Sequence, residues 1–201
     1  MKRIKLDLRK KYEHLYSPSA KRVQVIEVPR LRFLKVDGKG APESQAFHDA
    51  IQTLYGLSYA TKFGLKKEGI DYPVMALEGL WWTLGSTVRF DAQARDKWNW
   101  TLMMMQPDAA TAERFRAAAA EIRRKGKPVG AFRIEDFQEG LSAQIMHLGP
   151  YSAEAPTIEK IWGFMDENGY APNGKHHEIY LGDPRRAAPS KLRTILRQPI
   201  K

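Results

Sequence analysis

Hydrophobic and polar residues alternate in a short stretch near the C-terminus, and this alternation predicts a β-strand over 175–181. Apolar side chains dominate one side of that strand, and the other side carries His176, Glu178 and Tyr180. An acid between a histidine and a phenol is unusual on so short a strand. Glu178 is either an ordinary surface acid or, in a cavity, a desolvated anion that needs a cationic ligand or takes up a proton at raised pKa.

The same patterns along the rest of the chain predict further strands and helices. Strands are predicted at 23–28, 31–36, 74–82, 98–106, 131–137, 141–148 and 192–200, and helices at 43–67, 108–125 and about 153–168.

The order of these elements repeats. Strand, turn, strand, glycine-containing turn, helix, strand, strand occurs once in 22–106 and again in 131–200, with the helix at 108–125 as a connector. This repeat predicts an α+β domain of two similar halves in a pseudo-twofold arrangement. Clefts between modules are preferred ligand sites, so we expect a central ligand cleft, with Glu178 pointing into it.

Aromatic residues concentrate in the two predicted strands 74–82 and 98–106, which hold four of the five tryptophans. Trp81 and Trp82 point to opposite sides, and Trp100 shares a side with Trp98. Near a cleft, these rings would form flat walls for a planar or cationic ligand. The alternative is a tryptophan-rich core.

Tyrosines recur four residues apart in the helix predicted at 43–67, so Tyr55 and Tyr59 share one side. They either lie at the edge of a core or lend a hydroxyl to a pocket. The adjacent histidines His176 and His177 point apart on a strand, and no third ligand lies at useful spacing. We therefore expect no metal site, and no phosphate loop or dinucleotide fingerprint suggests a cofactor.

Composition narrows the class of protein. The 201 residues are 43% hydrophobic and 28% charged, which is ordinary for a soluble globular protein. The absence of cysteine excludes disulfides and suits the cytoplasm. No apolar run approaches the roughly 20 residues needed to span a bilayer, and the first 19 residues predict a basic, partly helical arm without the apolar core of a secretory signal.

The net charge of +10 allows a nucleic-acid partner, but the basic residues are scattered, and several fall where helices should end. Nucleic acid is therefore not the expected partner. The expected partner is a small molecule. The sequence does not predict an oligomeric state.

Five segments, taken together and in order, resemble the GyrI-like small-molecule-binding domain, and are most similar to its stand-alone bacterial branch. They are Leu-Glu-Gly-Leu-Trp-Trp at 77–82, Trp-Asn-Trp-Thr-Leu-Met at 98–103, Gln-Ile-Met-His-Leu-Gly-Pro-Tyr at 144–151, Lys-His-His-Glu-Ile-Tyr-Leu at 175–181 and Asp-Pro-Arg-Arg at 183–186. The resemblance covers about residues 20–201.

The resemblance implies a fold of two βαββ-type, SHS2-like modules around a central ligand cleft. Relatives fused to DNA-binding domains sense cationic, aromatic drugs through a buried glutamate, and stand-alone relatives are assigned hydrolysis of cyclopropane-bearing, DNA-alkylating natural products. Glu178 matches the family's acid. The residues that fall in matching segments and could line the cleft are Tyr55, Trp81, Trp82, Trp100 and Tyr151.

Two hypotheses follow for a chain of this family. In the first, the protein is a detoxifying hydrolase, with Glu178 activating water and a tyrosine, Tyr151, donating to the developing oxyanion. In the second, it binds aromatic or cationic xenobiotics without chemistry, as a sequestering or effector-type module with Glu178 as counter-ion. The expected ligand-binding residues in either case are Tyr55, Trp81, Trp82, Trp100, His176 and Tyr180.

Overall fold

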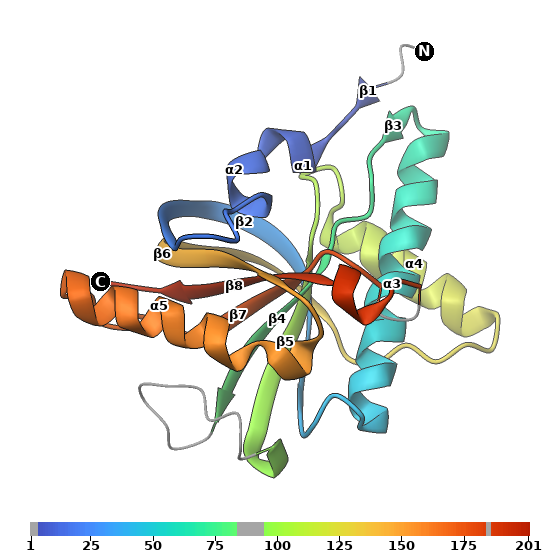
Figure 1. Ribbon diagram of the computed structural model, residues 1–201. Helices are drawn as coiled ribbons and strands as arrows, with labels where there is room; N and C mark the ends of the chain where they lie inside the picture. Colours follow the sequence, from blue (N-terminus) through green and yellow to red (C-terminus); the bar gives the residue numbers. More distant parts are fainter. Residues whose placement is uncertain (1–3, 84–94, 184–185) are drawn as a thin grey trace.

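Six antiparallel strands close into a barrel at the centre of the molecule (Figure 1). The computed structural model describes residues 4–83, 95–183 and 186–201. The barrel strands are β2 (Gln24–Lys39), β4 (Leu77–Thr83), β5 (Trp98–Met105), β6 (Arg133–Leu148), β7 (His176–Tyr180) and β8 (Arg193–Pro199). Their spatial order is β2-β5-β4-β7-β8-β6, and β6 returns to pair with β2.

Helices cover the outside of this barrel on two sides (Figure 1). The long α3 (Gln45–Lys67) and α5 (Ala155–Asn168) lie against different parts of the sheet, and α4 (Ala112–Arg124) packs with α3. Ser44 starts α3 because its side chain accepts a hydrogen bond from the backbone N–H of Phe47. The remaining short elements are β1 (Ile4–Lys5), α1 (Leu8–Lys11), α2 (Glu13–Tyr16), β3 (Ile70–Asp71), η1 (Arg95–Lys97), η2 (Tyr151–Ala153) and η3 (Pro189–Lys191).

Each half of the chain contributes three neighbouring strands to the barrel. The first half supplies β2, β5 and β4, and the second supplies β6, β8 and β7. The halves join twice, where β4 pairs with β7 and where β2 pairs with β6. The predicted α+β class is confirmed. The closed barrel was not predicted, since we expected each half to form its own sheet.

Two predicted turns are instead parts of long strands. The sequence predicts separate strands on either side of Pro29, but β2 runs through it, because Val28 opposite Gly140 and Arg30 opposite Gln138 keep one register. Pro29 therefore removes one N–H without ending the ladder. Likewise β6 is continuous where a turn was predicted at 139–140, and Gly140 there has φ of 77°, which only glycine adopts easily.

The core has an inner and an outer part, because side chains alternate across each strand. Inward residues such as Met103, Leu80 and Ile179 fill the barrel, and outward residues pack under α3 and α5. The first 19 residues, predicted as an arm, also contribute to the inner part. Leu15 and Tyr16 are buried there, so this segment packs against the barrel interior.

Candidate functional site

The outer face of β7 holds Glu178 within a short chain of hydrogen bonds. The hydroxyl of Tyr180 donates to Oε2 of Glu178 at 2.7 Å, and Nε1 of Trp81 donates to the Tyr180 oxygen at 3.0 Å. Nε2 of His176 lies 3.3 Å from the other carboxylate oxygen of Glu178. Strand pairing creates this arrangement, because Trp81 of β4 lies opposite His176 of β7.

A glycine makes room for this chain of donors. Gly79 lies opposite Glu178 in the β4–β7 ladder. A Cβ atom at position 79 would lie 2.8 Å from Nε1 of Trp81 and 3.2 Å from the Tyr180 hydroxyl. The absence of a side chain at Gly79 therefore lets the indole and the phenol meet above the strand.

A second carboxyl, that of Glu154, lies near Glu178. Glu154 immediately precedes α5 and is 5% exposed, and the Glu178 side chain is 12% exposed. Burial and then the negative charge of Glu178 raise the pKa of Glu154 to about 9. The start of a helix normally favours an anion, but here burial and like charge outweigh it. Glu154 is therefore a neutral proton donor at pH 7.

Two polar atoms beside this acid pair make no hydrogen bond of ordinary geometry to another described residue. They are Oε1 of Glu154 and Oγ1 of Thr194, and both are buried. Thr194 lies on β8 opposite Tyr180, and the hydrogen-bonding interaction of its hydroxyl with Glu154 lowers the pKa of Glu154, against the larger upward shift from burial and Glu178. Buried polar groups rarely stay unsatisfied, so these atoms are suited to hold a polar ligand atom or a water molecule.

Tyr151 covers the pair from the solvent side. Its ring packs edge-on against Tyr180 with centroids 5.5 Å apart, and it is 38% exposed. Burial, followed by the charges of Glu154 and Glu178, raises the pKa of Tyr151 to about 12. Burial and Glu178 also raise the pKa of Tyr180 well above its usual value. Both phenols therefore remain proton donors at neutral pH.

Tyr55 reaches the same site from α3. The charge of Tyr55 is the last-ranked cause of the upward pKa shift of Tyr151, so Tyr55 lies within electrostatic range of Tyr151. The structure thus gathers six residues predicted from the sequence: Tyr55, Trp81, Tyr151, His176, Glu178 and Tyr180.

Two predicted ligand-binding residues lie elsewhere. Trp100 is buried under α3, where its indole packs against Phe47 and donates to the carbonyl oxygen of Gly40 at 3.1 Å. Trp82 points away from Trp81, to the other side of β4, where Nζ of Lys175 lies 3.3 Å from its ring centre. Neither residue joins the acid pair.

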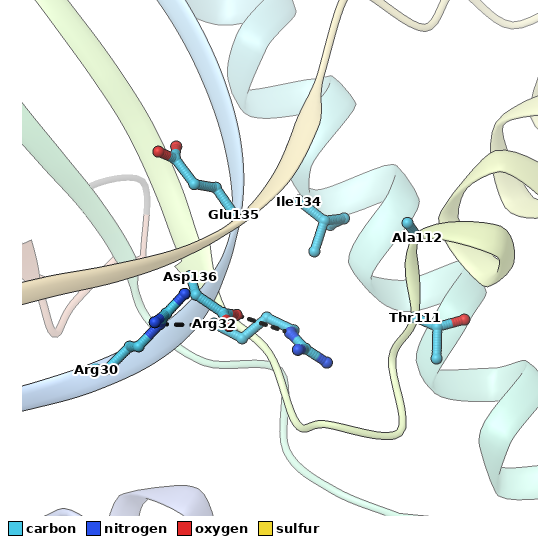
Figure 2. A pocket seen from close by; sticks show the side chains of 7 residues that line it. All are labelled: Arg30, Arg32, Thr111, Ala112, Ile134, Glu135 and Asp136. Atoms are coloured by element: carbon cyan, nitrogen blue, oxygen red, sulfur yellow. Dashed lines mark hydrogen bonds and ion pairs between the residues drawn. The ribbon is translucent and has the colours of Figure 1, made fainter.

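Hollows in the surface also lie away from the acid pair. One of about 500 Å³ is lined by Trp82, Lys175, Asp37 and Arg133 among others. Another of about 490 Å³ lies beside the start of α4, and Figure 2 shows Arg30 and Arg32 turned toward Asp136 there. The charges in that second hollow are all paired, Arg30 and Arg32 with Asp136, and Glu135 with Lys35 and Arg133 outside it. A buried pair of carboxyls in which the pKa of one is strongly raised indicates a catalytic site more strongly than either hollow does.

A different group of charges lies behind β7, inside the barrel. His177 has Nδ1 2.9 Å from Glu139 and Nε2 3.1 Å from Glu78. Arg197 donates to Glu139 at 2.9 Å, and the Tyr16 hydroxyl donates to Glu78 at 2.7 Å. We call Tyr16, Glu78, Glu139, His177 and Arg197 the interior network. All five are buried, so the network is closed to solvent.

Sequence reasoning did not single out Glu154, Thr194 or the interior network. Glu154 follows a Gly-Pro-Tyr turn and precedes Ala155-Pro156, a pattern typical of an ordinary helix start. The signal that could have identified it is its place three residues after Tyr151, in a segment already matched to the family. Pro184 and Arg185, which belong to the last matched segment, lie outside the described residues.

Within the described ranges, no group of three or more histidine, cysteine, aspartate or glutamate side chains is placed to hold a metal ion. No helix in the same ranges is both long and apolar enough to cross a membrane.

Two solved structures that are similar to this chain come from Listeria innocua. An uncharacterized conserved protein is 37% identical, with a TM-score of 0.90 over 98% of this chain and 100% of that one. A protein described as a hydrolase is 36% identical, with a TM-score of 0.87 over 100% of both chains. The EcmrR C-terminal domain shares the fold alone, at 9% identity and a TM-score of 0.58 over 90% of this chain and 97% of that one.

The search of curated proteins returned no match. The model of the GyrI-like small molecule binding domain matches residues 21–201, which is nearly the whole chain and includes Trp81, Tyr151, Glu154 and Glu178. Together with the two structures above 35% identity, this match assigns the chain to a family: it belongs to the GyrI-like small-molecule-binding domain proteins.

Proposed function

We propose that the protein binds small aromatic or cationic xenobiotics at the acid pair and hydrolyses those that carry a reactive cyclopropane, as a detoxifying enzyme. One observation supports this above the others: Glu178 lies beside a second carboxyl, Glu154, that burial and like charge keep protonated. A carboxyl kept neutral beside a second carboxyl is typical of acid–base catalysis. The Listeria innocua relative described as a hydrolase agrees with this proposal.

Glu178 would act as the general base and Glu154 as the general acid. Water attacks a cyclopropane carbon, the strained C–C bond breaks, and its electron pair moves through the conjugated system to the carbonyl oxygen. Glu178 takes the proton of the attacking water, and Glu154 gives its proton to the developing oxyanion. The net change is the addition of one water molecule.

Tyrosines and a tryptophan would position the substrate. Tyr180 already donates to Glu178 at 2.7 Å and thus fixes the orientation of the base. Tyr151, the donor predicted from the sequence, lies on the three-residue helix η2 and would donate a hydrogen bond to the developing oxyanion. Trp81 offers an aromatic wall beside them, and a cationic group would gain about 0.5–2 kcal/mol from such a ring.

We extend the proposal to the organisation of the chain. Residues 20–201 would form the ligand-binding unit, with βαββ-type, SHS2-like halves at about 22–106 and 131–200 and α4 as connector. Both halves contribute to the acid pair's surroundings, since Trp81 belongs to the first and Glu178 to the second. Residues 1–19 would brace the barrel, and the protein would act in the cytoplasm.

The test is incubation with a cyclopropane-bearing alkylator followed by mass spectrometry of the products. The native protein should yield a product heavier by one water, and Glu178→Gln and Glu154→Gln should each lower the rate by about 10²–10⁴-fold. Glu167→Gln, an exposed acid on α5, is the matched control and should keep full activity. Full turnover in Glu178→Gln would exclude its role as base.

The second candidate function is binding without turnover, as a sequestering or effector-type module. The contact that favours it is the aromatic and anionic pairing of Trp81, Tyr180 and Glu178, which suits a cation whether or not it reacts. In that case Glu178→Gln should weaken binding of a cationic ligand far more than of its neutral analogue. Equal weakening of both would contradict a counter-ion role.

A further inference from the structure

A row of aromatic rings on α3 leads away from the acid pair. Tyr55, Tyr59 and Phe63 are spaced four residues apart, so they lie on one side of the helix. Ring centroids are 6.3 Å apart for Tyr55 and Tyr59 and 6.1 Å apart for Tyr59 and Phe63. The planes of these pairs are within 22° and 25° of parallel. We call these three residues the α3 row.

The outer two rings of the row are not needed to hold the helix in place. Tyr59 is 45% exposed and Phe63 is 53% exposed, whereas Leu54 and Leu57 on the opposite side are fully buried. Adjacent exposed aromatic rings form an apolar patch, and such patches typically mark binding surfaces. The row therefore has contact surface to offer a ligand.

The row is continuous with the proposed site. Tyr55 at its inner end lies near Tyr151, whose pKa it helps to raise. Tyr151 packs against Tyr180, and Tyr180 donates to Glu178. Aromatic side chains thus occur both at the buried carboxylate and along the α3 row to its exposed end. From Tyr55 to Phe63 the helix rises by about 12 Å.

We propose that the α3 row binds the part of a flat aromatic ligand that extends beyond the acid pair, and so selects ligands by length. This inference rests on the proposed function, because it places the ligand's reactive or cationic end at Glu178. A single-ring ligand would contact only the rings nearest the pair. A longer one would also cover Tyr59 and Phe63, and each added ring contact would strengthen its binding.

Two cations with the same charged ring test this. The short probe is 1-methyl-4-phenylpyridinium, and the long probe is 1-methyl-4-(biphenyl-4-yl)pyridinium. By calorimetry the native protein should bind the long probe about threefold to tenfold more tightly, the value of one added aromatic contact. Tyr59→Ala and Phe63→Ala should reduce this preference toward one while leaving the affinity for the short probe unchanged. Val25→Ala, another exposed apolar residue, is the control and should leave both affinities unchanged.

The possible failures are distinguishable. If the short probe binds in a Glu178-dependent way but the long probe gains nothing, or if Tyr59→Ala weakens both probes equally, the α3 row has no role in selection. If Phe63→Ala converts a dimer to a monomer in gel filtration, a second copy of the chain occupies the row and the inference is overturned. If the short probe does not bind, or binds equally to Glu178→Gln, the proposed function fails and this inference with it.

Discussion

Two pairs of glutamates flank β7, and their environments differ in one decisive respect. The interior pair, Glu78 and Glu139, shares a histidine and an arginine. The outer pair, Glu154 and Glu178, has phenols, an indole and a threonine around it, with one histidine beside Glu178. One glutamate of each pair, Glu139 inside and Glu154 outside, is buried, yet their pKa values are shifted in opposite directions.

Inside the barrel the charges balance. Burial alone would raise the pKa of Glu139, but the charges of His177 and Arg197 outweigh it and lower that pKa to about 2. Burial would lower the pKa of His177, and Glu139 outweighs that and raises it. Glu139 thus faces two cations, and the network joins four strands and the segment that carries Tyr16.

On the outer face, no cation offsets the effect of Glu178 on Glu154 among the causes of the Glu154 pKa shift. Burial and the charge of Glu178 act in the same direction on Glu154 and raise its pKa to about 9. A carboxyl that stays protonated at neutral pH destabilises the fold, because the unfolded chain could ionise it freely. The comparison teaches that the paired glutamates stabilise the structure and the unpaired one is available for function.

The largest effect should come from removing a cation of the interior network. Arg197→Met leaves Glu139 with His177 as its remaining charged partner, and breaking a buried pair in this way costs about 3–5 kcal/mol. Urea unfolding monitored by tryptophan fluorescence measures the loss. Arg193→Met, at the exposed start of the same strand, is the control and should cost under about 1 kcal/mol. Equal losses would show that the network adds no stability of its own.

Replacing Glu154 should instead raise the free energy of unfolding. Between about pH 4.3 and 9 the folded state holds a proton on Glu154 that the unfolded state releases, so the free energy of unfolding falls as pH rises. Glu154→Gln abolishes this loss and should stabilise the fold by about 3–4 kcal/mol at pH 7, with a gap that widens toward pH 9.

Urea unfolding of Glu154→Gln and the native protein at pH 5, 7 and 8.5 measures that gap. The same experiment on Glu167→Gln, an exposed acid of the same helix, should show no pH-dependent difference from native. A gap for Glu154→Gln that stays constant with pH would mean that Glu154 ionises in the fold as it does in the unfolded chain.

A smaller effect should follow from closing the space above Gly79. Gly79→Ala places a methyl group 2.8 Å from the Trp81 nitrogen, so the indole must shift and its hydrogen bond to Tyr180 is lost. We expect a cost of about 1 kcal/mol and a change in tryptophan emission. Gly64→Ala, on α3 where a methyl group meets no neighbour, is the control. Unchanged emission in Gly79→Ala would show that the indole does not depend on this space.

Much of the fold could be predicted from the sequence, because hydrophobic residues recur with a clear helical or strand period in most elements. Predicted helices at 43–67 and 153–168 match α3 and α5 within about two residues, and the strand with Glu178 matches β7. The closed barrel did not follow, since it depends on β2 and β6 pairing across more than 100 residues of sequence. Local patterns at Pro29 and Gly140 indicated turns that long-range pairing overrides.

The candidate site followed only in part, for a related reason. Alternation on one strand and the family resemblance identified Glu178 and its neighbours. Glu154 and Thr194 come from segments with ordinary local patterns, and only the folded arrangement brings them beside Glu178. Trp82 could not be separated from Trp81 without knowing which side of β4 faces the acid pair.

One measurement tests the central comparison most directly: a pH titration of the glutamate side-chain carboxyl carbons by NMR, with Glu154→Gln and Glu139→Gln used to assign the signals. Glu154 should titrate near pH 9 and Glu139 near pH 2, on either side of an ordinary glutamate at about 4.3. Titration of both carboxyls near 4.3 would contradict the account, because the outer pair would then hold no neutral acid and the two regions would not differ.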